Sequence, residues 1–471
     1  MTETIHTDIC VIGAGSAGLS VAAGAAQLGA ATVLVEAGKM GGDCLNYGCV
    51  PSKSMIAAAH AAEVMRRADR FGIAAVAPTI DFPAVQDHVQ GVIDAIAPAD
   101  SVDRFEGLGV RVIQARAAFT GRGEIAAGDH RVRARRFVVA TGSTAAAPPI
   151  PGLDTVPYLT NETVFANRTL PDHLIVIGGG PIGAELAQAH RRLGARVTVL
   201  EAFTILGKDD PELTEIVKRR LRAEGVDLRE GVKIDGVSGA AGDFTVVLDG
   251  GEKITASHLL VAAGRRPNVG GLGLDVAGIA HSAKGIQVDR RLRTTNRKVF
   301  AVGDVAGGPQ FTHAANYHAG IVVRNALFRL PAKVDYTALP WVTYTDPELA
   351  HVGLTEDQAK TAHGDIRVLR WPFADNDRAQ AERDTAGMIK AITTKRGRVL
   401  GASIVGAHAG ELIQPWVLAV GKGLKIGDFA NMIVPYPTRG EVGKRAAGSF
   451  YAATLFSEKT RRIVRFLARF G

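Results

Sequence analysis

The chain has 471 residues, enough for about two to four domains, and 46% of them are hydrophobic. Only three cysteines in a chain of this length argue against a secreted, disulfide-rich protein, and we expect the protein in the reducing cytoplasm. The net charge of +8 suits anionic cofactors and substrates but does not by itself indicate nucleic acid. The first residues contain no basic or apolar leader and no apolar run reaches about 20 residues, so we expect neither a signal peptide nor a membrane span.

The first predicted unit is a strand, turn, helix and strand over residues 7–36. Its turn reads GAGSAG directly after an apolar strand, which is the dinucleotide-binding fingerprint in its required context. Gly13 permits the tight turn, Gly15 lets a pyrophosphate approach the backbone, and Gly18 lets helix and strand pack closely. The helix N-terminus then faces the negative charge, and Glu36 at the end of the second strand can accept hydrogen bonds from a ribose.

Two of the three cysteines follow this unit, five residues apart, at Cys44 and Cys49. On a regular helix their Cα atoms would lie about 8–9 Å apart, whereas a disulfide needs less than about 7 Å. Pairing therefore requires a bend, for which Gly48 supplies a flexible joint, and a bent disulfide is easily reduced. A metal half-site or two unrelated buried thiols are the alternatives. No second cysteine pair completes a zinc site, so we favour a redox-active disulfide and expect no metal site.

The same nucleotide-binding device recurs after an apolar strand that ends at residue 177. Its glycines are Gly178, Gly180 and Gly183, and its second strand ends at Glu201. In both units the acidic residue lies 18 positions after the third glycine. Two incidental glycine-rich turns would not match in spacing, strand context and terminal acid, so the pattern predicts two bound dinucleotides.

Glu201 bears on the choice of nicotinamide cofactor. A carboxylate at this place pairs with a free 2′-hydroxyl and repels a 2′-phosphate. The three residues after Glu201 include no arginine that could hold such a phosphate. We therefore expect NAD(H) to be favoured over NADP(H).

Three further segments extend the pattern: Ala140–Ser143, Ala263–Asn268 and Val299–Asp304. With the two fingerprints and the cysteine pair, they resemble the pyridine nucleotide–disulfide oxidoreductases over nearly the whole chain. Lipoamide dehydrogenase, glutathione reductase and mercuric reductase belong to this flavoenzyme family. The resemblance implies a homodimer in which each chain binds FAD and NAD(H).

The resemblance also implies a fold, an α/β chain with two Rossmann-like domains and a C-terminal α+β dimerisation domain. The expected FAD-binding domain comprises residues 1–150 and returns over 276–340. The NAD(P)-binding domain is expected at 151–275, and the dimerisation domain at 341–471. The residues implied for cofactor binding are Gly13, Gly15, Gly18, Glu36, Lys53, Thr141, Gly142, Gly303 and Asp304 for FAD, and Gly178, Gly180, Gly183, Glu201 and Gly264 for NAD.

Catalytic roles follow from the same resemblance. Cys49 is similar to the charge-transfer thiol next to the flavin, and Cys44 to the interchange thiol that meets the substrate. Lys53 resembles the lysine beside the flavin N5 edge, and Glu185 resembles its carboxylate partner. The alternative for Lys53 and Glu185 is an ordinary surface ion pair.

The chain departs from two members of the family at a place where they have a histidine. Tyr436 stands there, while Glu441 keeps the position of the glutamate five residues later. An imidazole with a pKa near 6.5 can accept a thiol proton at neutral pH, whereas a phenol with a pKa near 10 cannot do so readily. We expect Tyr436 to donate a hydrogen bond or to stack, and lipoamide turnover to be impaired unless Glu441 or solvent compensates.

Mercuric reductase shares the tyrosine and resembles the run Cys49–Ile56. However, that enzyme delivers metal through a cysteine pair near its C-terminus, and residues 465–471 here contain none. No metal-binding module precedes the first fingerprint either, so we expect inefficient handling of mercury.

The sequence thus predicts an FAD-dependent oxidoreductase that passes electrons between NAD(P)H and a disulfide, metal ion or other acceptor through Cys44 and Cys49. A dihydrolipoyl dehydrogenase is the first alternative. A mercuric reductase-like enzyme and a flavin-dependent quinone reductase or transhydrogenase are the second, and a non-catalytic flavoprotein is a rival of a different class.

The last predicted element is a basic amphipathic helix over residues 458–470. Ile463, Phe466, Leu467 and Phe470 share one face, while one lysine and four arginines fill much of the rest. One hypothesis is that this face docks on the protein and leaves the basic side in water. The other is that it makes reversible contact with an anionic membrane, near a quinone pool.

Overall fold

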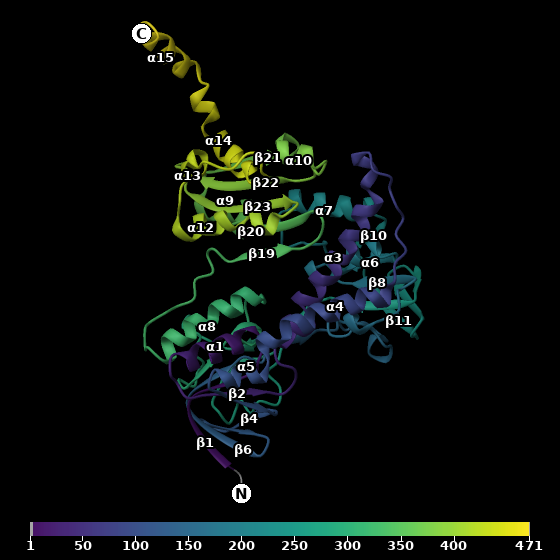
Figure 1. The fold of residues 1–471 in the computed structure, drawn as a ribbon, viewed down its shortest axis with the longest axis vertical. Helices are drawn as coiled ribbons and strands as arrows, with labels where there is room; N and C mark the ends of the chain where they lie inside the picture. The colour runs from purple at the N-terminus through teal and green to yellow at the C-terminus, as the bar shows by residue number, and fades with distance from the viewer. Residues whose placement is uncertain (1–2, 471) are drawn as a thin grey trace.

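The computed structural model describes residues 3–470, and its first sheet lies near the N-terminus (Figure 1). The strand order is β3-β2-β1-β6-β5-β4, and β18 pairs in parallel with β6 although about 160 residues separate them. Helices α1 (Ser16–Gln27) and α8 (Thr312–Ala326) pack on each other beside this sheet, near the short α5 (Val102–Gly107). The strands are β1 (Glu3–Ile12), β2 (Thr32–Glu36), β3 (Val110–Gln114), β4 (Ala117–Gly121), β5 (Glu124–Ala127), β6 (His130–Val139) and β18 (Val299–Ala301).

A second, four-stranded parallel sheet has the order β10-β9-β8-β14. Strands β8 and β9 are buried along most of their length, as expected for a parallel sheet covered on both faces. The elements are β8 (His173–Ile177), β9 (Arg196–Glu201), β10 (Val226–Glu230), β14 (His258–Val261), α6 (Pro181–Arg192), α7 (Pro211–Ala223) and the antiparallel β11 (Ile234–Ala240), β12 (Asp243–Leu248) and β13 (Lys253–Ala256). Four short strands form two further antiparallel pairs, β7 (Ser143–Ala145) with β15 (Arg265–Pro267) and β16 (His281–Ser282) with β17 (Gly285–Ile286), and Ile286 of β17 lies in the core of the first sheet.

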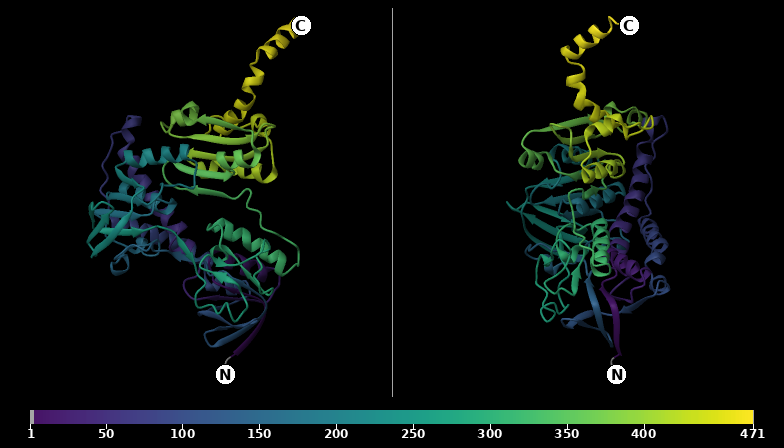
Figure 2. Two further views of the ribbon diagram at one scale, coloured as in Figure 1. Left: turned by 180° about the vertical axis from the view of Figure 1, so that it is seen from behind. Right: turned by 90° about the vertical axis from the view of Figure 1, so that its left-hand side faces the viewer.

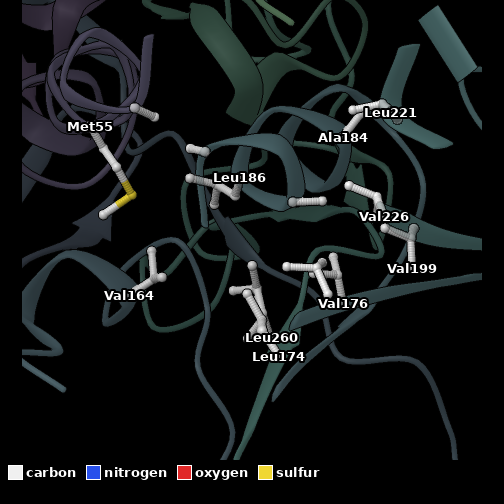
Figure 3. Close-up of a cluster of buried hydrophobic side chains, with 14 of the residues drawn as sticks. Met55, Val164, Leu174, Val176, Ala184, Leu186, Val199, Leu221, Val226 and Leu260 are labelled. Carbon is white, nitrogen blue, oxygen red and sulfur yellow. The ribbon is translucent and has the colours of Figure 1, made fainter. Parts of the chain in front are cut away.

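Two helices that lie between β2 and β3 in the sequence pack beside the second sheet. After the short α2 (Gly42–Asn46), α3 (Cys49–Arg66) and α4 (Phe82–Ile96) run alongside the second sheet. Figure 3 shows the contact: Met55 of α3 lies in the same buried cluster as Leu186 of α6 and Leu174 of β8. The helix that begins with Cys49 is therefore anchored in the core of the second dinucleotide-binding unit.

The C-terminal part is an antiparallel sheet of order β19-β20-β23-β22-β21 with helices around it. Its core includes Trp416, whose ring stacks on Phe429 at a centroid distance of 4.0 Å. The strands are β19 (Pro340–Thr343), β20 (Glu348–Gly353), β21 (Ile366–Pro372), β22 (Met388–Thr394) and β23 (Val399–Gly406), and the helices are α9 (Glu356–His363), α10 (Asp377–Ala381), α11 (Ala409–Leu412), α12 (Gln414–Lys422), α13 (Ile426–Asn431) and α14 (Glu441–Leu455). The predicted fold class, two Rossmann-like domains and a C-terminal α+β domain, is confirmed.

The last helix, α15 (Glu458–Leu467), projects away from the rest of the molecule in all three views (Figures 1 and 2). Every residue from Arg461 to Phe470 is exposed. The interpretation that its apolar face docks on the same chain is therefore wrong.

Within residues 3–470, no helix combines the length and the apolar character needed to cross a bilayer.

Candidate active site

The first glycine-rich turn has the geometry that its sequence predicts. Gly13 has φ +105°, and a Cβ there would lie 2.4 Å from the carbonyl oxygen of Ala140. A Cβ on Gly18 would lie 1.8 Å from the carbonyl oxygen of Gly13, so helix α1 crosses the turn at a distance that excludes any side chain. Gly15 begins α1 without a capping side chain, and the first turn of the helix has no acidic residue. This helix N-terminus keeps donors for an anionic group.

The second turn repeats this arrangement. Gly178 has φ +110°, and a Cβ on Gly183 would lie 2.0 Å from the carbonyl oxygen of Gly178. Gly180 begins α6 without a side-chain cap, and a Cβ there would meet nothing within 4 Å. Open space in front of an uncapped helix N-terminus fits a pyrophosphate.

The two acidic residues also take equivalent positions. Glu36 accepts hydrogen bonds from the amides of Ala14 and Gly38, and Glu201 accepts them from Gly179 at 2.7 Å and Phe203 at 2.9 Å. Each carboxylate is thus fixed between its own turn and the end of its own strand.

Cys44 and Cys49 lie on either side of a break between two helices. Cys44 belongs to α2, Cys49 opens α3, and the non-helical Gly48 (φ −125°, ψ −107°) separates them. The predicted bend is therefore present. The structure holds both as free thiols, with Cys44 half-buried and Cys49 exposed, whereas Cys10 is buried within β1.

The two thiols differ strongly in acidity. A hydrogen bond from the Cys44 thiol lowers the pKa of Cys49 to about 6 against the effect of burial, with help from Thr312 and the charge of Lys53. The Thr312 Oγ1 atom lies 3.4 Å from the Cys49 sulfur. The same bond to Cys49, together with burial, raises the pKa of Cys44. Near neutral pH the reduced pair therefore consists of a thiolate at Cys49 and a protonated thiol at Cys44.

Lys53 lies one helical turn after Cys49 and forms an ion pair with Glu185, with 2.7 Å between Nζ and Oε2. The Glu185 side chain is 5% exposed, so this is not an ordinary surface pair. Its other oxygen accepts a hydrogen bond from the amide of Tyr344 at 2.9 Å, and the Tyr344 ring lies under the Lys53 ammonium at 4.4 Å. The lysine is thus held in place from α6 and from the segment after β19.

A polar network joins four segments that are far apart in the sequence. Ser143 donates to Asp304 at 2.6 Å and accepts from Arg265 at 2.7 Å, and Arg265 lies 3.2 Å from Asp43. Burial raises the pKa of Asp304, although Ser143 and the charge of Arg265 oppose this. Nearby, Thr141 donates to the carbonyl oxygen of Asn268 at 2.8 Å. The network brings the expected second flavin segment next to the residues that precede Cys44.

These features fit two dinucleotides. The turn at Gly13 with Glu36, the network at Asp304 and the lysine at position 53 would hold FAD. The turn at Gly178 with Glu201 would hold the nicotinamide nucleotide. The uncapped helix N-termini supply donors for the pyrophosphates, and the polar side chains supply partners for hydroxyl groups.

Tyr436 and Glu441 lie elsewhere. Tyr436 is 69% exposed and donates a hydrogen bond from its hydroxyl to Asp377 at 3.0 Å, which raises its pKa. Glu441 begins α14. Within residues 3–470, no hydrogen bond or ion pair joins either of them to the cysteine pair of the same chain.

Several residues of this region were not expected from the sequence. Ser143 and Arg265 belong to segments that resemble the family, but the expected cofactor contacts in these segments were assigned to Thr141, Gly142 and Gly264. Asp43 directly precedes Cys44. The only indication for Thr312 in the sequence is its position shortly after the second flavin segment. Nothing in the sequence indicates Tyr344.

Comparisons with known proteins agree with this geometry. Residues 7–319 match the family model described as pyridine nucleotide-disulphide oxidoreductase, and residues 339–447 match the model of its dimerisation domain. The chain is 36% identical over 458 residues to a mercuric reductase of Streptomyces lividans, covering 94% of this chain and 97% of that protein. It is also 36% identical over 454 residues to a dihydrolipoyl dehydrogenase of Geobacillus stearothermophilus, covering 94% and 96%.

Among solved structures, the chain is similar to the copper(II) complex of the HOCl-induced flavoprotein disulfide reductase RclA from Escherichia coli. The TM-score is 0.85 at 28% sequence identity, and the match covers 93% of this chain and 99% of that one.

Proposed function

Because the chain belongs to the pyridine nucleotide-disulphide oxidoreductase family, we propose that it oxidises NADH with FAD and passes the electron pair through Cys44 and Cys49 to a disulfide or a metal ion. NAD(P)H–disulfide oxidoreductase function is common to this family. The observation that carries the assignment to these residues is the acidity of Cys49, maintained by Cys44, Thr312 and Lys53.

In this proposal each residue of the site has a separate role in electron or proton transfer. When bound, FAD supplies the two-electron relay between the nicotinamide and the sulfur pair. Reduction of a Cys44–Cys49 disulfide consumes two electrons and, because Cys49 stays a thiolate near neutral pH, one proton that ends on Cys44. Lys53, oriented by Glu185, provides the positive charge that stabilises this thiolate.

Cys44 then acts as the nucleophile towards the acceptor, after losing its proton. With a disulfide acceptor, its sulfur forms a mixed disulfide and releases the first thiolate. Attack of Cys49 on the Cys44 sulfur releases the second thiol and restores the internal disulfide. The raised pKa of Cys44 makes a base useful for this step.

We place Tyr436 and Glu441 of one chain of a homodimer beside the Cys44–Cys49 pair of the other chain. The matching dimerisation domain supports the dimer, and the exposure of Tyr436 leaves it free to approach a partner chain. The phenol serves as a hydrogen-bond donor there, and Glu441 is the candidate base.

We assign one of these functions to each of the domains that contain the three main sheets. FAD occupies residues 1–150 and 276–340, the nicotinamide nucleotide occupies 151–275, and 341–471 are the domain through which the chains dimerise. We assign the protein to the cytoplasm, where its few thiols stay reduced.

Dihydrolipoyl dehydrogenase activity is the second candidate. The 36% identity to such an enzyme and the presence of Glu441 favour it, while Tyr436 in place of histidine counts against it. The metal-ion alternative is favoured by the similar identity to a mercuric reductase.

The relay is tested by adding NADH to the FAD-loaded protein without oxygen. A long-wavelength absorbance band that is absent from Cys49→Ser supports it, whereas flavin bleaching without that band in the wild type rejects it. Rates with lipoamide, glutathione disulfide, mercuric ion and quinones then identify the acceptor. Tyr436→His is expected to raise lipoamide turnover, and no change would reject the role assigned to this tyrosine.

A further inference from the structure

Helix α15 is the largest feature that the redox chemistry leaves unexplained. It begins directly after Ser457, whose side chain caps it by accepting a hydrogen bond from the Thr460 amide, and it follows α14 after a short break. The match to the dimerisation domain ends at residue 447, so α15 lies outside the part that the family model describes. Figures 1 and 2 show it projecting from the C-terminal domain.

One face of α15 is apolar and exposed. At 3.6 residues per turn, the four large apolar side chains of α15 fall within one arc of the helix, and Phe470 follows just after its last residue. Their exposed fractions range from 48% to 74%, although side chains of this kind are normally buried. They are Ile463, Val464, Phe466, Leu467 and Phe470. A helix this short is marginal in water by itself, so its apolar face is the part of α15 that requires a partner.

The opposite face is basic. Residues 458–470 contain five basic side chains and a single acidic one, Glu458. Arg462 and Arg465 are 77% and 68% exposed, and both lie near Glu458, which cannot neutralise all five charges. Four of the five basic residues are arginines, whose guanidinium groups suit phosphate oxygens.

We infer that α15 binds reversibly to the surface of an anionic lipid bilayer. The apolar arc would enter the boundary between headgroups and acyl chains, and the arginines would contact lipid phosphates. The excess positive charge of the whole chain, +8, favours approach to such a surface. A second copy of the helix fits less well, because apposed helices would bring two sets of five basic side chains together.

The test uses the full-length, FAD-loaded protein and co-sedimentation with vesicles of phosphatidylcholine, with or without phosphatidylglycerol. Binding is expected only to the anionic vesicles and should weaken as salt is added. A chain that ends after Ser457, and the double variant Phe466→Ser with Leu467→Ser, should each reduce the bound fraction roughly tenfold. The matched control is Val276→Ser, at a side chain that is 59% exposed on another part of the protein, and it should bind like the wild type.

Charge is tested separately with Arg462→Glu against Arg396→Glu, an exposed arginine in the turn between β22 and β23. Only the first should lower binding to anionic vesicles. Equal and negligible binding by the full chain and the truncated chain overturns the inference. So does loss of a larger oligomer on truncation without vesicle binding, because the face would then be covered by another copy. NADH oxidation by the truncated chain should equal that of the full chain, which separates this outcome from a failure of the redox proposal.

Discussion

At the scale of single residues, the site depends on an imbalance between two neighbouring thiols. Cys49 receives a hydrogen bond from Cys44, contacts Thr312 and lies near the charge of Lys53. Thr312 and the backbone of Cys49 also lower the pKa of Cys44, but the hydrogen bond to Cys49 and burial outweigh them. The acidity is therefore set by the surroundings of the pair, which come from α2, α3 and α8. Each of these contributions can be removed separately.

Thr312→Val should raise the pKa of Cys49 from about 6 towards the ordinary thiol value, because the thiolate loses a hydrogen bond. The thiolate is present above its pKa and lost as the pH falls through it, so the loss should occur at higher pH in the variant. The pH dependence of the ultraviolet thiolate absorbance of the reduced protein measures this. Thr337→Val, at an exposed threonine outside the site, is the control. An unchanged titration in Thr312→Val would show that the 3.4 Å contact does not support the thiolate.

Glu201→Gln should lower kcat/KM for NADH about tenfold, because a charged hydrogen-bond acceptor for the ribose is lost. The value for NADPH should rise or stay constant, since the repulsion of a 2′-phosphate is removed as well. Steady-state kinetics with both nucleotides give the ratio. Glu252→Gln, at an exposed residue of the same domain, should leave it unchanged. A wild-type preference for NADPH would contradict the role given to Glu201.

At the scale of elements, helices α3 and α6 share the central ion pair of the site and a buried core. The same two helices carry Cys49, Lys53 and Glu185, and Met55 and Leu186 from them lie in one buried cluster. A second ionic contact joins α7 to the C-terminal sheet: Lys390 of β22 is 4% exposed and lies 2.7 Å from Asp210. Glu212 and Glu356 surround the same ammonium.

Lys390→Met should destabilise the fold by about 3 kcal/mol at neutral pH, because the buried carboxylate of Asp210 loses its ion-pair partner, while Glu212 and Glu356 keep their contacts with Arg370. Hydrogen bonds from Lys360 and Lys390 lower the pKa of Glu356 to about 2, and hydrogen bonds from Arg370 and Lys390 lower the pKa of Glu212. Stability from such depressed groups is present above the unfolded pKa and lost as the pH falls towards 2, so the difference from the wild type should shrink in acid. Thermal unfolding at several pH values measures it. Lys395→Met, at an exposed pair with Asp365, should cost less than about 1 kcal/mol.

The elements that the sequence predicted well are those set by local pattern. The turns at Gly13 and Gly178 were predicted correctly because only glycine fits positions where a Cβ would overlap the backbone. Thr312, Arg265 and Tyr344 were missed, since their contacts depend on chain closure over more than a hundred residues. The docking of α15 on its own chain, one of the two alternatives, was predicted wrongly, because an amphipathic pattern specifies a face and not its partner.

At the scale of the whole molecule, the proposed site requires two chains. Tyr436 and Glu441 belong to the C-terminal domain and make no contact with the cysteine pair of their own chain among the described residues. The matching dimerisation domain provides the arrangement in which they could meet the pair of a partner.

Mixed dimers test this arrangement. Cys44→Ser and Tyr436→Ala should each be impaired as homodimers. A heterodimer with one chain of each kind would have one doubly defective site and one intact site, so it should recover about half of the wild-type activity. Differently tagged chains purified in sequence allow the measurement. Activity no higher than the mean of the two homodimers would place Tyr436 in the site of its own chain.

The pairing of β18 with β6 has a consequence for how the chain is made. Synthesis proceeds from the N-terminus, and residues 173–261 of the second parallel sheet leave the ribosome before β18 does. The last residues of β6, Phe137–Val139, therefore lack their β18 partner while the unit inserted into the first domain folds. Helix α8, which packs on α1 and supplies Thr312, arrives later still. A nascent chain that ends before Thr312 thus contains Cys44, Cys49 and Lys53 without the hydroxyl group that completes the support of the Cys49 thiolate. The full acidity of Cys49 is acquired only when the first domain is completed.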